Sequence, residues 1–172
     1  AGPSIDNDLH FIQKHADNVM VITCGSSISI MLENDVIPDV HVEIENVPEA
    51  LEMLSSVAKK HDLSPVRLMG STTMYPGIPA LFKKIFFYFR SGVATFHQFR
   101  TGCQTEIRDA VPSVANLGLA LAGELGCDQI CLFGVDLGAH DPKSHHAADT
   151  AYMQGEIEFE WFGDAVKSVA NF

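Results

Sequence analysis

The chain opens on a turn whose residue types could bind an anion. Gly2 allows a ligand to approach the backbone closely, and Pro3 fixes a φ angle suited to the start of a helix. Ser4 follows directly. The N–H groups of a helix start carry partial positive charge and attract phosphate. We therefore expect Gly2, Pro3 and Ser4 to present backbone N–H groups to a phosphate-bearing nucleotide, the alternative being an ordinary helix-opening turn.

A polar loop over residues 138–150 holds the residues best suited to acid–base chemistry. Histidine titrates close to neutral pH and can deprotonate an acceptor hydroxyl. His145 and His146 are therefore the candidate catalytic bases. The histidine spacing matches no regular zinc pattern and no cysteine lies nearby, so no metal site is predicted. Tyr152, just beyond the loop, is a candidate contact to the phosphate.

Three arginines, Arg90, Arg100 and Arg108, lie around a long predicted loop over residues 91–112. A guanidinium group can bind a carboxylate or a phosphate through two parallel hydrogen bonds. Arg100 is the candidate contact to an anionic ligand, although loop arginines are usually only solvated.

The remaining candidates follow predicted strands or begin a helix. The Asn side chain can both donate to and accept from a base edge or a ribose hydroxyl. The Asp side chain can accept from a ribose or a base amine, or hold a metal. Each also has a structural alternative, as a turn residue, a helix cap or a loop cap. These candidates are Glu45, Asn46, Ser113, Asn116, Gly134 and Asp136.

Apolar strands alternate with amphipathic helices along the chain, which predicts a doubly wound, mainly parallel, Rossmann-like α/β sheet. Ligands bind at the carboxyl ends of the strands in such a sheet. The turn at Gly2 and the six candidates above would therefore meet at one edge. The predicted strands cover residues 19–23, 40–44, 66–69, 85–89 and 129–133, and the predicted helices cover 4–16, 27–34, 48–61, 76–84, 114–125 and 156–169.

Composition narrows the classes of function. The 172 residues are 47% hydrophobic, which suits a single domain over 1–172. The chain has no initiator Met and starts inside a strand-to-helix turn, so we expect a fragment of a longer protein that lacks the first strand. A net charge of −11 argues against nucleic-acid or anionic-membrane partners. No apolar run approaches a membrane span and no CxxC pair occurs, which favours a cytoplasmic protein.

Four segments carry a family resemblance in register along the chain. They are Gly2–Asp6, Ile37–Asn46, Pro112–Asn116 with the helix that follows, and Leu125–Leu137. This pattern resembles the central domain of the Maf (motility-associated factor) flagellin glycosyltransferases, and it is also similar to a domain of archaeal 6-hydroxymethyl-dihydropterin diphosphokinases. The family turn usually reads Gly-x-Gly-Pro-Ser, and its leading glycine is absent here.

The Maf resemblance implies a sialyltransferase-like domain of a protein that takes part in bacterial motility. Such a domain would transfer pseudaminic or legionaminic acid from a CMP-activated donor to Ser or Thr hydroxyls of flagellin, with inversion. No cofactor would be required, and a divalent cation such as Mg²⁺ stays an open option. One alternative is an ATP- and Mg²⁺-dependent pterin diphosphokinase, with Asp136 and either Asp141 or Asp149 as the carboxylates. The others are a noncatalytic nucleotide-binding module and a flagellin-binding module.

Overall fold

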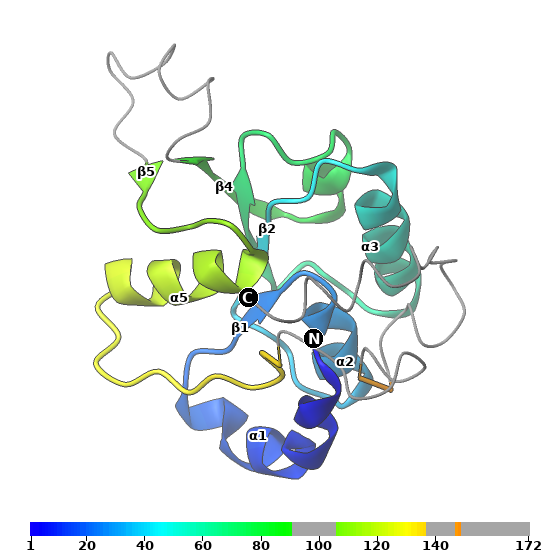
Figure 1. The fold of residues 1–172 in the computed structure, drawn as a ribbon. Coiled ribbons are helices and arrows are strands. Elements are labelled where there is room, and N and C mark those ends of the chain that lie inside the picture. The colour runs from blue at the N-terminus through cyan, green and yellow to red at the C-terminus, as the bar shows by residue number, and fades with distance from the viewer. Residues whose placement is uncertain (91–105, 137–146, 149–172) are drawn as a thin grey trace, which may run out of the picture.

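The computed structural model describes residues 1–90, 106–136 and 147–148. Its centre is a sheet of five strands that lie in chain order, and every neighbouring pair is parallel (Figure 1). The predicted parallel α/β architecture is therefore confirmed. The strands are β1 (Ile22–Cys24), β2 (Val40–Glu43), β3 (Arg67–Ser71), β4 (Lys84–Arg90) and β5 (Glu106–Ile107).

Local sequence signals explain where the helices begin and end. Pro48 begins the longest helix, where its missing N–H removes no hydrogen bond, and Lys59 and Lys60 occupy its last turn. None of the described helices has the length and apolar content needed to cross a membrane. The helices are α1 (Leu9–His15), α2 (Ser27–Glu33), α3 (Pro48–Lys60) and α5 (Val114–Glu124), with 3₁₀ turns at Pro3–Asn7, Ala16–Asn18 and Ile78–Leu81.

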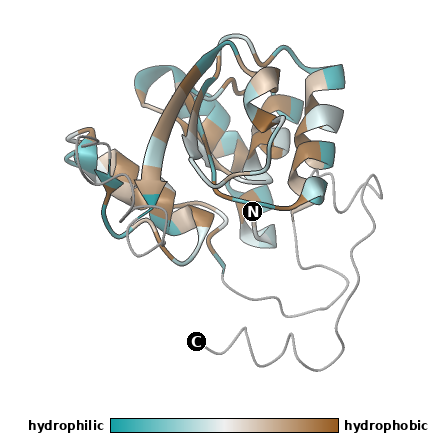
Figure 2. Ribbon diagram, turned by 90° about the horizontal axis from the view of Figure 1, so that it is seen from above, coloured by the Kyte–Doolittle hydropathy of each residue, from teal (hydrophilic) through white to brown (hydrophobic). Residues whose placement is uncertain are grey.

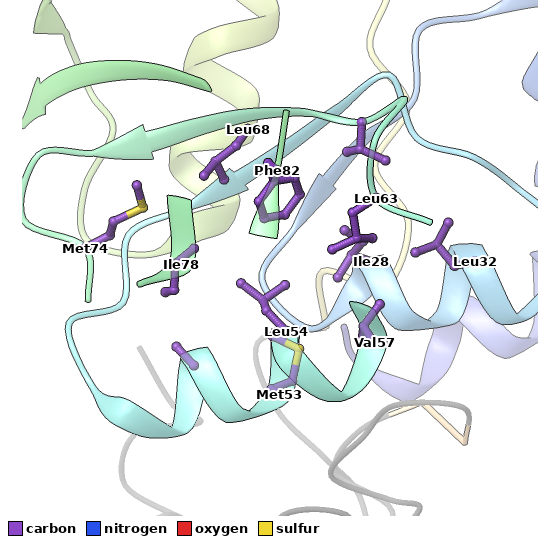
Figure 3. Close-up of a cluster of buried hydrophobic side chains, with 12 residues drawn as sticks. Ile28, Leu32, Met53, Leu54, Val57, Leu63, Leu68, Met74, Ile78 and Phe82 are labelled. Atoms are coloured by element: carbon purple, nitrogen blue, oxygen red, sulfur yellow. The ribbon is translucent and has the colours of Figure 1, made fainter. Parts of the chain in front are cut away.

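Helices pack on both faces of the sheet, as expected for a doubly wound fold (Figure 1). On one face, α2 and α3 bury Ile28, Leu54 and their neighbours against Leu68 of β3 (Figure 3). On the other face, Leu117 and Leu121 of α5 pack against β2 and β4. Each helix in Figure 2 carries both hydrophobic and hydrophilic residues, as a helix with one face on a sheet must.

The segment that follows α5 differs from its prediction. Residues 129–133 form no strand, and Ile130 and Leu132 are 41% and 58% exposed. Cys131 is also exposed, although its apolar neighbours in the sequence predict a buried thiol. Among the described residues the sheet ends at β1, so this segment does not add a strand to its free edge.

Three other element predictions differ in detail. The predicted helix 4–16 is divided into a 3₁₀ turn and α1. The predicted helix 76–84 is only the turn Ile78–Leu81, because Pro79 limits its hydrogen bonding and β4 starts at Lys84. The strand β5 lies within the predicted loop 91–112. The predicted loop 138–150 falls almost wholly outside the described residues, and the predicted helix 156–169 lies entirely outside them.

Gly118 lets α5 approach β1 closely. A Cβ atom at this position would lie 2.5 Å from Cys24 Sγ, whereas a Cβ atom at Gly123 would meet nothing within 4 Å. Both glycines belong to α5, so they form a matched pair for testing the packing of this helix.

We predict opposite effects for alanine at these two glycines. Gly123→Ala should stabilise the protein by about 0.5–1 kcal/mol, because alanine has the higher helix propensity. Gly118→Ala should be destabilising, because the clash with Cys24 outweighs that gain. Urea unfolding of the two variants measures both effects. Equal stabilisation by both would contradict the packing of α5 on β1.

Candidate functional site

The N-terminal turn lies beside the segment that holds Gly134 and Asp136. The Gly2 N–H donates to the Gly134 carbonyl at 2.7 Å, and the Ser4 N–H donates to Asp136 Oδ2 at 2.9 Å. The Ser4 hydroxyl donates to the other oxygen of the same carboxylate. A Cβ atom at Gly2 would lie 2.3 Å from Asp136 Oδ2, so any larger residue would displace the Asp136 side chain. The structure thus brings together four residues that the sequence placed at one edge.

This geometry differs from the one expected if the N-terminal turn presented its N–H groups to a phosphate. Pro3–Asn7 is a single short 3₁₀ turn, and the Ser4 N–H that was expected to meet a phosphate is bonded to Asp136. The arrangement matches the alternative in which Asp136 caps a loop. A role for Gly2, Pro3 and Ser4 in nucleotide binding stays a prediction.

Ser113 and Asn116 begin α5 with a reciprocal capping box. The Asn116 N–H donates to Ser113 Oγ at 3.4 Å, and the Ser113 N–H donates to Asn116 Oδ1 at 3.3 Å. Val114, the first residue of α5, lies 3.4 Å from the Cβ position of Gly25, which follows β1. The start of α5 therefore lies at the carboxyl end of β1, as a nucleotide site at this edge requires.

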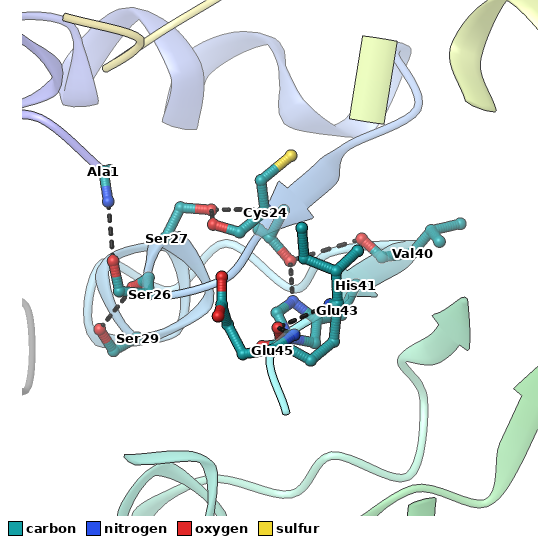
Figure 4. Close-up of polar contacts among 11 residues, drawn as sticks. Ala1, Cys24, Ser26, Ser27, Ser29, Val40, His41, Glu43 and Glu45 are labelled. Carbon is teal, nitrogen blue, oxygen red and sulfur yellow. Dashed lines mark hydrogen bonds and ion pairs between the residues drawn. The ribbon is translucent and has the colours of Figure 1, made fainter. Parts of the chain in front are cut away.

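Glu43 is a buried carboxylate that the sequence prediction missed. Its side chain lies at the end of β2 with the residue 0% exposed. Glu43 Oε1 accepts from the N–H groups of Ile44 at 2.7 Å and Glu45 at 2.9 Å (Figure 4). His41 is equally buried, and its Nε2 lies 3.8 Å from Glu43 Oε2. The signal for this pair was present, since a histidine and a glutamate alternate with valines in an otherwise apolar strand.

Glu45 is exposed and firmly held at the edge. Its N–H is bonded to Glu43, and its carbonyl accepts from the Tyr75 N–H at 2.8 Å. Partial burial and the neighbouring Glu43 carboxylate raise the pKa of Glu45, while Arg90 on β4 opposes that shift. Asn46 is exposed beside it. Glu45 and Asn46, the two predicted nucleotide contacts that follow β2, therefore both lie at the carboxyl edge of the sheet.

Tyr88 is a second buried polar residue that the sequence prediction missed. It lies on β4 in register with Ser71 of β3 and is 1% exposed. Burial of the hydroxyl raises the pKa of Tyr88 to about 12, although nearby Arg90 opposes the shift. The hydroxyl is therefore a neutral donor over the whole physiological range.

The other predicted site residues lie outside the described residues: Arg100, His145, His146 and Tyr152. Within the described ranges, no group of three or more His, Cys, Asp or Glu side chains could hold a metal ion. The structure therefore brings Gly2 and Ser4 together with Gly134 and Asp136, and it does not test the histidine base.

The raised pKa of Tyr88 predicts a pH effect on stability. The folded state holds the proton more tightly than the unfolded state, whose tyrosine titrates near about 10. The stabilisation is complete below about pH 10 and is lost as the pH rises toward about 12. Tyr88→Phe should therefore lose less unfolding free energy than the wild type between pH 8 and pH 11, measured by urea unfolding. Parallel declines would contradict the burial of this hydroxyl.

Comparison with known proteins fits this arrangement. A model of the family described as 6-hydroxymethylpterin diphosphokinase MptE-like matches residues 1–142. The chain belongs to this MptE-like family. Among solved structures, it is similar to the Maf glycosyltransferase from Magnetospirillum magneticum AMB-1, with 33% sequence identity and a TM-score of 0.76. The resemblance stated from the sequence is thereby confirmed. A search of curated proteins found no match.

The two chains differ greatly in length. The match covers 82% of this chain and 22% of the Maf glycosyltransferase. The MptE-like domain therefore corresponds to about a fifth of that protein. The part that the two proteins share is the parallel α/β sheet described above.

Proposed function

We propose that this MptE-like chain is the nucleotide-sugar-binding and catalytic domain of a glycosyltransferase. The observation that carries the proposal is the match to the Maf glycosyltransferase over 82% of the chain. It is supported by the position of Glu45, Asn46 and Ser113, which follow strands or begin α5 at the carboxyl edge of a parallel sheet.

The proposed donor is a CMP-activated nonulosonic acid of the pseudaminic or legionaminic type, and the proposed acceptor is a Ser or Thr hydroxyl of flagellin. The acceptor oxygen bonds to the anomeric carbon while the bond from that carbon to the phosphate oxygen breaks, which inverts the configuration. The electron pair leaves with CMP, and the acceptor proton passes to a base, for which His145 and His146 are the candidates. Electrostatic stabilisation of the departing CMP anion is the main catalytic demand.

Neither a cofactor nor a membrane or nucleic-acid partner enters this proposal, and a role for Mg²⁺ is an open prediction. The second candidate is a pterin diphosphokinase that uses ATP, favoured by the description of the matching family. It would need a carboxylate for Mg²⁺, and Asp136 is bonded to Ser4 in the structure. A noncatalytic nucleotide-binding or flagellin-binding module is the third.

Isothermal titration calorimetry with CMP, ATP and 6-hydroxymethyl-dihydropterin separates these candidates. We predict binding of CMP and no binding of the pterin. Asn46→Ala should weaken CMP roughly three- to tenfold, the loss expected for one hydrogen bond. Asn18→Ala is the matched control, because Asn18 is also exposed but precedes β1 at the opposite edge of the sheet.

The control variant should bind CMP as tightly as the wild type. Binding of ATP or the pterin without any response to CMP would contradict the glycosyltransferase proposal and favour the kinase. Binding of CMP that is equally weak in both asparagine variants would remove Asn46 from the site.

A further inference from the structure

His41 and Glu43 form a buried acid–base pair on one face of β2. Both residues are 0% exposed, and side chains two positions apart on a strand point to the same face. His41 Nε2 lies 3.8 Å from Glu43 Oε2, and neither atom has a hydrogen-bond partner among the described residues (Figure 4). Buried polar atoms are rarely left without a partner. The distance is within ion-pair range and too short for a bridging water, so the two atoms are candidate partners for each other.

The other contacts of the His41 ring fix its orientation. Phe82 stacks on the ring at a centroid distance of 5.8 Å and an interplanar angle of 12°. Nδ1 lies 3.1 Å from the hydroxyl oxygen of Thr23, which is opposite His41 on β1, and the apolar Leu68 is opposite on β3. These contacts hold the plane of the ring and direct Nε2 toward Glu43.

The second carboxylate oxygen of Glu43 holds the backbone that leads to a predicted nucleotide contact. Oε1 accepts from the N–H groups of Ile44 at 2.7 Å and Glu45 at 2.9 Å. The Glu45 carbonyl accepts from the Tyr75 N–H at 2.8 Å, and Asn46 is the next residue. A change in the direction of the Glu43 carboxylate is therefore transmitted to the backbone that carries Asn46.

Donor counting decides which nitrogen of His41 carries the proton. An ionised carboxylate only accepts hydrogen bonds, whereas a neutral imidazole has one donor and one acceptor nitrogen. A proton on Nδ1 would leave a lone pair of Nε2 facing the Glu43 carboxylate, which is repulsive. A proton on Nε2 points at the carboxylate, and Nδ1 then accepts from the Thr23 hydroxyl. That hydroxyl lies nearer to Nδ1, at 3.1 Å, than to the Val40 carbonyl, at 3.4 Å, which agrees with this direction.

We propose that His41 is a positioning residue of the nucleotide site, and that its Nε2–H donates to Glu43 and so holds the backbone before Asn46. The chain of contacts runs from Thr23 on β1 through His41 and Glu43 to the end of β2. Because His41 is 0% exposed, it acts on a ligand only through Glu43. Its effect on CMP rests on the proposed function, whereas the position of its proton does not.

Long-range proton–nitrogen correlation spectra of the histidine rings test the position of the proton. We expect it on Nε2 of His41 in the wild type. Glu43→Gln should move it to Nδ1, because the glutamine carbonyl would accept from the Ile44 and Glu45 N–H groups while its amide N–H donates to Nε2. A proton on Nδ1 alone in the wild type, or no change in Glu43→Gln, would overturn the proposal.

Calorimetry with CMP tests the effect on the site through a matched pair of variants. The amide of His41→Gln places a donor near the position of Nε2, whereas the shorter side chain of His41→Asn reaches only the position of Nδ1. His41→Asn should weaken CMP roughly three- to tenfold, and His41→Gln should stay within about twofold of the wild type. Val57→Ala is the control for general destabilisation, because Val57 is 4% exposed in the core that also holds Phe82. It should lower the thermal midpoint without changing the affinity for CMP.

The remaining outcomes decide against the positioning role. Equal losses of affinity in both His41 variants, or the same loss in Val57→Ala, would show a merely structural role. An unchanged affinity in a folded His41→Asn would show that His41 does not act on the site. If His41→Asn does not fold, the position of the proton in the wild type decides. If the wild type binds no CMP, the proposed function fails and the positioning role fails with it, whereas each of the other results leaves CMP binding by the wild type intact.

Discussion

The buried carboxylate of Glu43 is the constraint on which the edge of the sheet depends. A charged group at 0% exposure is tolerated only where hydrogen bonds replace water, and two backbone N–H groups supply them. Those bonds end β2 and fix the direction in which the chain continues through Glu45. Because β2 lies between β1 and β3, its end lies inside the carboxyl edge and not at its border. The candidate site therefore depends on one buried acid that contacts no solvent.

The two apolar cores hold this edge from opposite faces. His41 stacks on Phe82 at a ring-centroid distance of 5.8 Å on the face covered by α2 and α3, whereas Val42 packs toward α5. The alternation of β2 thus directs His41 and Val42 to opposite cores, and the strand ends at the buried Glu43. Gly118 brings α5 close enough for Ser113 to lie beside β1. The positions of the site residues follow from this packing rather than from contacts among themselves.

Much of the fold could be predicted from the sequence, because each of the first four strands is a short apolar run followed by a turn or helix signal. Pro48 and Ser113 marked the starts of α3 and α5 correctly. The run at 129–133 had the same composition but forms no strand, since strand formation depends on a neighbour that composition does not reveal. The candidate site, too, could be predicted only in part. The proximity of Ser4 and Asp136 followed from the edge rule, whereas the hydrogen bonds between them and the burial of Glu43 and Tyr88 required the structure.

The central claim is that the carboxyl edge of this sheet binds the nucleotide, and amide chemical-shift mapping with CMP tests it most directly. Proton–nitrogen correlation spectra should show shifts at Gly25–Ser27, Glu45–Asn46 and Ser113–Asn116. Residues 18–20 before β1 and Asp39 before β2 should stay unchanged. Shifts confined to the amino ends of the strands, or no shifts at saturating CMP, would contradict the account.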